Sequence, residues 1–77
     1  MKRISLVNMK AGQKGKLAEI SGGMNLHARL SSMGLHHGRE LTKLSHIGLR
    51  GPVVVKAGRT IMALGYGAAS KVIVEIP

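Results

Sequence analysis

Glycine spacing is the strongest constraint on what this chain can fold into. Eleven glycines are spread along its 77 residues, so the stretches between them are short. Because glycine favours turns and weakens helices and strands, we expect short elements joined by tight turns. The chain has no cysteine, which excludes disulfides and thiolate metal sites as supports for a small core. Its 44% of hydrophobic residues must form that core unaided, and we expect a single domain over residues 1–77.

The segments between the glycines predict mostly strands. Stretches suited to short strands occur at residues 14–20, 39–47, 51–57, 59–64 and 71–76. Outside them, residues 1–13 are expected to form an arm that ends in a turn, and residues 65–70 a loop or a single helical turn. With one helix added, this pattern predicts an all-β fold with one short helix, built as a small five-stranded barrel that is closed or nearly closed.

The pattern also indicates which strand faces are buried. Val53 and Val55 share one face, and we expect Met62 and Leu64 to meet them across a hairpin. In the first strand the alternation is less clear, because Leu17 stands on the face opposite the other apolar residues.

One helix has start and stop signals. Asn25 is the expected N-cap, and Leu26, Leu30 and Met33 then fall on one face at spacings of four and three. Gly34 closes the helix, because glycine takes the left-handed C′ conformation without steric cost. The helix is therefore expected to have about two and a half turns.

No catalytic constellation is visible. The three glutamates, Glu19, Glu40 and Glu75, have no second carboxylate nearby in sequence, and the chain has no aspartate. No serine stands in a nucleophile-elbow pattern. We therefore expect a protein that is not an enzyme.

The only plausible metal ligands are four histidines, which are His27, His36, His37 and His46. No two of them have the i, i+4 spacing of a helical metal pair, and adjacent histidines do not easily reach one ion. We expect hydrogen-bonded or solvated turn histidines, without a cofactor or resident metal. A native transition-metal site is the alternative interpretation.

The balance of charge favours acidic partners. Twelve Lys and Arg against three Glu give a net charge of +9. The single aromatic residue, a tyrosine, excludes both stacking platforms for single-stranded nucleic acid and aromatic grooves for proline-rich peptides. No apolar run of signal-peptide or membrane-span length follows the basic start, so we expect a soluble, cytoplasmic chain.

Several segments together carry a family resemblance. They are residues 6–15, the string Arg-Leu-x-x-Met-Gly-Leu at 29–35 with Gly38 after it, and residues 51–55, 62–64 and 72–75. Through them, residues 6–76 resemble the FeoA family, the small cytosolic A component of the bacterial ferrous iron transport system. Three features depart from the family pattern. His37 stands where proline is usual, Lys43 where an apolar strand residue is common, and residues 65–67 replace a more basic stretch.

The resemblance implies an SH3-like barrel with a helix between its first two long strands. It also implies a non-catalytic accessory protein that acts by protein–protein contact on the membrane ferrous iron transporter and its cytosolic GTP-binding region. Contact with the membrane is then expected only through that partner. A related domain occurs in some iron-dependent repressors, but nothing in this chain resembles their DNA-binding or metal-sensing parts.

Basic and apolar side chains alternate around the predicted helix end, which makes it the candidate partner surface. Its residues are Arg29, Met33, Gly34, Leu35, His36 and His37. The alternative is a basic barrel that binds structured RNA or DNA through phosphates. The charge supports this interpretation, but the basic residues are spread along the chain instead of clustered, and nucleic acid is the less favoured partner.

Overall fold

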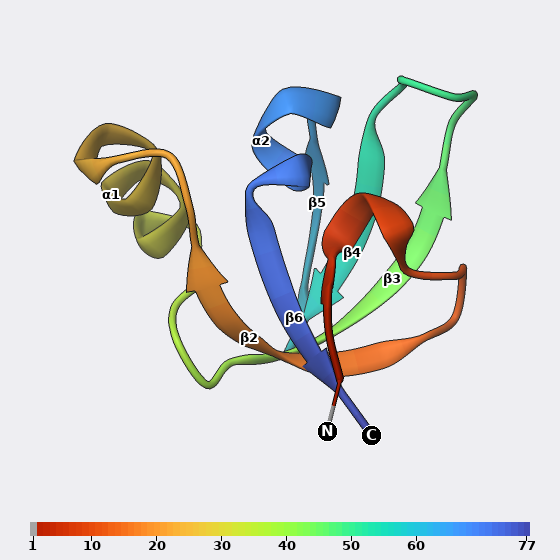
Figure 1. The fold of residues 1–77 in the computed structure, drawn as a ribbon, viewed down its shortest axis with the longest axis horizontal. Helices are drawn as coiled ribbons and strands as arrows, with labels where there is room; N and C mark the ends of the chain where they lie inside the picture. The colour runs from red at the N-terminus through yellow and green to blue at the C-terminus, as the bar shows by residue number, and fades with distance from the viewer. Residues whose placement is uncertain (1) are drawn as a thin grey trace.

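A computed structural model describes residues 2–77, and its strands form one antiparallel sheet (Figure 1). The elements in chain order are β1 (Lys2–Ser5), a 3₁₀ turn (Leu6–Asn8), β2 (Lys14–Ile20), α1 (Met24–Ser32), β3 (Glu40–His46), β4 (Val53–Ala57), β5 (Thr60–Leu64), α2 (Tyr66–Ser70) and β6 (Val72–Ile76). The fold is thus mostly β, as predicted, and residues 65–70 contain the expected helical turn.

The sheet differs from the predicted five-stranded barrel. It has six strands in the order β1-β6-β2-β3-β4-β5, and it is open, with β1 and β5 at its edges. The extra strand lies in the predicted arm, where Lys2 pairs with Ile76 and Ser5 pairs with Ile73. Residue 1, the first of that arm, lies outside the described residues. Because β1 is only four residues long and none of them is fully buried, its own pattern gives little strand signal, and its pairing with β6 defines it.

The core lies inside the curved sheet. The predicted hairpin contact is confirmed, because Val53 pairs with Leu64 and Val55 pairs with Met62. The buried apolar residues are Leu6, Met9, Leu17, Leu30, Leu35, Leu41, Val53, Val55, Ala57, Met62, Leu64, Ala69, Val72, Val74 and Ile76. They come from every strand except β1, so the strands after it share one core.

Two irregularities in strand pairing determine which side chains face this core. In β2 the register against β6 shifts between Leu17 and Glu19. A spacing of three normally places two strand residues on opposite faces, but the shift turns both Leu17 and Ile20 inward. This shift explains why the sequence over residues 14–20, which forms β2, alternates less clearly than the other strands. In β3 a second shift lies between Lys43 and Ser45, and it turns Lys43 and His46 to the same face of the strand.

The helix α1 begins and ends by different means. It starts at Met24 with Gly23 as N-cap and no side-chain capping bond, so the expected cap at Asn25 is wrong and that residue lies in the first turn. Its end is as predicted. Gly34 has φ +95°, its N–H donates to the Ser31 carbonyl at 3.0 Å, and the Leu35 N–H donates to the Leu30 carbonyl at 2.9 Å. These bonds form a Schellman motif.

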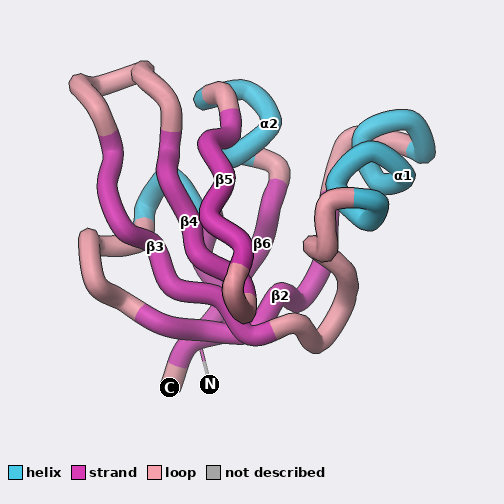
Figure 2. Tube along the Cα trace, turned by 180° about the vertical axis from the view of Figure 1, so that it is seen from behind, coloured by secondary structure: helices cyan, strands magenta, loops and turns pink. Residues whose placement is uncertain are grey.

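The connections divide the molecule into two ends. The turn between β3 and β4 lies at the same end as α1 and α2, while both chain termini lie at the opposite end (Figures 1 and 2). We call these the helical end and the terminal end. Over residues 2–77, no helix has the length and apolar character needed to cross a membrane.

Candidate interaction surface

The first predicted partner residue, Arg29, lies in the last turn of α1 and is exposed. A cation is favourable there because the helix dipole and the free carbonyls concentrate negative potential at this end. Its backbone carbonyl accepts a hydrogen bond from the Ser32 hydroxyl at 2.8 Å. The guanidinium is therefore presented to solvent from an ordered helix end.

The residues that follow Arg29 do not all remain at the surface. Met33 is 38% exposed and Gly34 is half-buried, while His36 and His37 are exposed. Leu35, in contrast, is completely buried in the core. This corrects the prediction of Leu35 as a contact residue, because the second bond of the Schellman motif folds it back beneath the helix.

Two shallow hollows flank this surface. One, of about 400 Å³, lies between α1 and α2 and is lined by Gly22, Asn25, Leu26, Arg29, Ala68 and Lys71. The other, of about 530 Å³, is lined by His36, His37, Gly38, Arg39, Glu40 and Gly58. The predicted surface is thus divided, with Arg29 beside one hollow and both turn histidines beside the other. The lining of the first hollow combines two cations with the aliphatic side chains of Leu26 and Ala68 and includes no acidic group, which suits an acidic side chain.

The histidines do not come together. His36 and His37 precede β3, while His46 is its last residue, so the length of the strand separates them. His27 is exposed on α1. Within residues 2–77, no three or more His, Cys, Asp or Glu side chains are grouped closely enough to hold a metal ion.

Lys43 lies at the centre of a polar cluster that the sequence did not predict. It is 1% exposed, and its Nζ donates hydrogen bonds to the backbone carbonyls of Met9 at 2.6 Å and Val7 at 3.1 Å. Burial lowers the pKa of Lys43 from its ordinary value of 10.5. The ammonium therefore ties the segment after β1 to the inner face of β3.

His46 extends this cluster toward the surface. Its Nδ1 lies 3.4 Å from Lys43 Nζ, and in the tautomer that carries its proton on Nε2 this Nδ1 accepts a hydrogen bond from the ammonium. That Nε2 is buried and has no hydrogen-bond partner among the described residues. The register shift in β3 makes the contact possible, since it turns Lys43 and His46, three residues apart, to the same face opposite Val55 and Val53.

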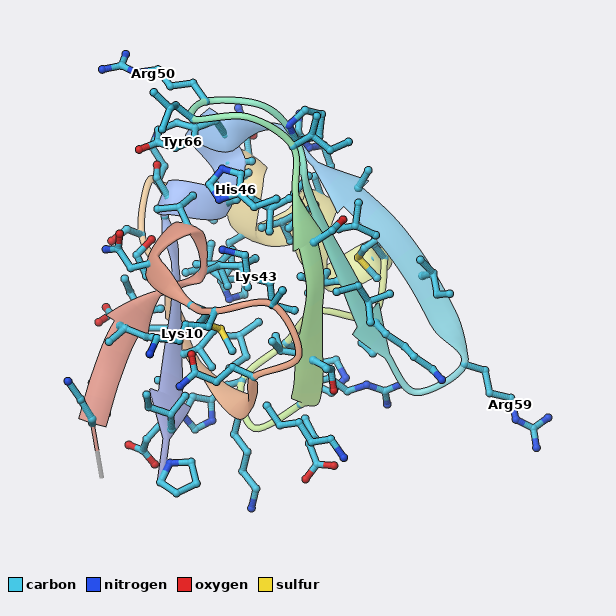
Figure 3. The ribbon with its side chains drawn as sticks, turned by 90° about the vertical axis from the view of Figure 1, so that its right-hand side faces the viewer. Lys10, Lys43, His46, Arg50, Arg59 and Tyr66 are labelled. Atoms are coloured by element: carbon cyan, nitrogen blue, oxygen red, sulfur yellow. The ribbon has the colours of Figure 1, made fainter. Side chains whose placement is uncertain are left out.

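The cluster continues through an aromatic contact to an exposed cation. The rings of His46 and Tyr66 have centroids 6.0 Å apart, and Arg50 Cζ lies 6.0 Å from the Tyr66 centroid. Figure 3 shows the resulting series, with Lys43 inside, His46 and Tyr66 above it, and Arg50 reaching outward at the helical end. The only signals in the sequence were a lysine at an apolar strand position and a single tyrosine.

Comparisons with known proteins agree on both family and fold. Residues 4–76 match the family model described as the FeoA domain. The crystal structure of an iron uptake regulatory protein (FeoA) is 33% identical, with a TM-score of 0.86 and coverage of 97% of each chain. No curated protein sequence matches the chain.

Two structures of lower sequence identity share the fold. The solution structure of FeoA from Chlorobium tepidum is 23% identical, with a TM-score of 0.86 and coverage of 95% of this chain and 70% of that one. A manganese-dependent transcriptional repressor is 22% identical, with a TM-score of 0.88. The present chain covers 42% of that repressor, so the likeness concerns one part of a longer protein.

Proposed function

The chain belongs to the FeoA family, and from this premise we propose that it is a non-catalytic, cytoplasmic accessory protein that binds the membrane ferrous iron transporter. Membership of the family implies involvement in ferrous iron transport. The proposed contact is with the transporter's cytosolic GTP-binding region. On this chain it uses the end of α1 and the following turn, with the exposed Arg29, Met33, His36 and His37 and the half-buried Gly34.

The observation that carries this proposal is the chemistry of the α1 end. An exposed arginine stands there beside a half-exposed methionine, next to a hollow whose other cation is Lys71. Arginine and methionine are enriched in protein interfaces, and methionine adapts its shape to an irregular partner. Such a surface is suited to an acidic patch with an apolar centre.

The charge of the whole chain supports the same partner. A net charge of +9 steers acidic surfaces toward the protein and speeds their encounter. Contacts of this kind contribute more to the rate of association than to the lifetime of the complex.

The test is a charge reversal at Arg29. The Arg29→Glu variant should slow association with the cytosolic GTP-binding region and weaken the salt dependence of the rate. Lys10→Glu is the matched control, because Lys10 is also exposed but lies in the turn before β2. Rates measured at two ionic strengths for the three proteins separate a local effect from the loss of net charge.

The result can also contradict the proposal. Equal slowing by the two variants would show that only net charge matters, and a larger effect of Lys10→Glu would move the contact to the basic segment 10–16. Tight, strongly salt-dependent binding to generic structured RNA at physiological salt would favour the nucleic-acid alternative instead.

A further inference from the structure

The turn between β3 and β4 exposes two large aliphatic side chains at its tip. Ile47 is 61% exposed and Leu49 is 92% exposed, and only Gly48 separates them. Single exposed aliphatic residues are ordinary on protein surfaces. A pair within three residues at the end of a turn is a different feature, because it offers two apolar side chains at one point of the molecule.

This tip has a defined shape. The Ile47 N–H donates to the Pro52 carbonyl at 3.1 Å, which closes the turn. Gly48 has φ +66°, and a Cβ atom on Gly51 would overlap the Ile47 carbonyl. Both glycines are thus required by the backbone, and the turn holds its aliphatic side chains away from the core.

The surroundings of the tip are cationic. Arg50 follows Leu49 directly and lies over the Tyr66 ring, which is itself part of the cluster anchored by Lys43. No acidic residue occurs in the sequence between Glu40 and Glu75. Glu40 begins β3 and Glu75 lies near the end of β6, so both belong to the terminal end.

We propose that the β3–β4 tip docks this protein directly on an anionic membrane surface. Ile47 and Leu49 enter the boundary between headgroups and acyl chains, and Arg50 pairs with lipid phosphate. Charge favours a membrane as the partner of this tip, since a chain with a net charge of +9 is attracted to an anionic leaflet. The tip also combines aliphatic side chains with a cation and has no acidic residue nearby in sequence, and apolar and cationic groups together are what bind interfacial helices to anionic lipid.

This inference goes beyond the proposed function. The expected route to the membrane was through the transporter alone, whereas the tip gives the chain a contact of its own. The two surfaces are separate, since the proposed transporter contact lies on α1 and the turn after it, and the lipid contact lies on the β3–β4 turn. Either one can fail without the other.

The experiment is co-sedimentation of the full chain with lipid vesicles. Vesicles of phosphatidylcholine mixed with phosphatidylglycerol should bind the protein, and vesicles of phosphatidylcholine alone should bind it more weakly. Leu49→Ser and Ile47→Ser should each weaken partitioning into the anionic vesicles by roughly tenfold, because each removes one inserted aliphatic group.

Two matched controls are available in the chain. Ile61→Ser changes an isoleucine of nearly equal exposure, 62%, which lies in β5 beside the β4–β5 turn and should leave partitioning unchanged. Arg50→Gln should weaken binding more than Arg59→Gln, although both remove one charge. Figure 3 shows Arg50 and Arg59 at opposite ends of the molecule. Unchanged melting temperatures would confirm that all variants remain folded.

The outcomes separate lipid from other occupants. The proposal is supported if the tip variants lose partitioning into anionic vesicles and the control variants keep it. Wild-type protein that remains unbound to anionic vesicles at low salt overturns it, as does equal loss with Ile61→Ser. Loss of binding to the transporter's cytosolic region with Leu49→Ser, without any effect on vesicles, also overturns it and identifies the tip as a protein contact.

Discussion

Lys43 donates a hydrogen bond from its buried Nζ to the backbone carbonyl of Met9 over 2.6 Å, and this contact joins β3 to the segment that follows β1. The partners of this ammonium are neutral carbonyls and an imidazole nitrogen. A buried charge without a carboxylate nearby is costly, although the hydrogen bonds offset part of the cost. The contact therefore orders the chain while the charge itself opposes folding.

The first prediction follows from the lowered pKa of Lys43. Between that pKa and the ordinary value of 10.5, the unfolded chain binds more protons at Lys43 than the folded chain does. The contribution of Lys43 to the free energy of unfolding must therefore rise with pH across this window, because the cost of burying the charge disappears. Denaturant unfolding at pH values of about 7 and 10 should show wild type gaining stability relative to Lys43→Met.

Lys10→Met is the control for this experiment, since it removes one positive charge from an exposed position. A stability difference between wild type and Lys43→Met that stays constant with pH would contradict the prediction. In that case the folded and unfolded chains would bind equally many protons at Lys43 over this pH range, and burial would not lower its pKa.

The second prediction concerns the attachment of α1. Leu30 is completely buried, so Leu30→Ala should leave a cavity and lower the free energy of unfolding by about 2–5 kcal/mol. Leu49→Ala removes the same atoms from a side chain that is 92% exposed, and its effect should stay within about 0.5 kcal/mol. Denaturant midpoints measure both, and similar shifts for the two variants would show that α1 is not docked through Leu30.

Local patterns predicted much of this fold. The strand over residues 14–20 has the predicted bounds, and the contact between Val55 and Met62 follows from simple alternation. The end of α1 at Gly34 was equally predictable, because a glycine directly after a helical apolar pattern marks a helix end. The β1 strand was missed for the opposite reason, since its pairing partner lies at the other end of the chain.

The polar cluster shows a different limit of sequence reasoning. Lys43 and His46 are three residues apart, and regular alternation would place them on opposite faces. Only the register shift against β4 brings them together. The acceptor carbonyls of Lys43 belong to Val7 and Met9, which are far away in the sequence and whose side chains take no part. No local pattern carries such a contact.

The third prediction compares two glycines. A Cβ on Gly15 would stand 2.5 Å from Val74 Cγ1 and 2.7 Å from the Glu75 carbonyl oxygen, so Gly15→Ala should force β2 away from β6 and destabilise the protein by about 1–3 kcal/mol. Gly67 lies inside α2, and a Cβ added there would meet nothing within 4 Å. Gly67→Ala should therefore stabilise that helix by about 0.5–1 kcal/mol. Melting temperatures that move in the same direction would contradict this assignment.

The last prediction is that the fold does not depend on a metal ion. The turn histidines, His36 and His37, are exposed, and β3 separates them from His46. A metal that binds only the folded chain would raise the melting temperature as its concentration increases. We therefore expect neither a chelator nor added Zn²⁺ to shift the melting temperature, and a double variant of His36→Ala and His37→Ala to behave in the same way. His46 is unsuitable for this test, because it packs against Tyr66 and its loss would destabilise the protein without any metal. A chelator that lowers the melting temperature by more than a few degrees would contradict the prediction and reopen the histidines as ligands.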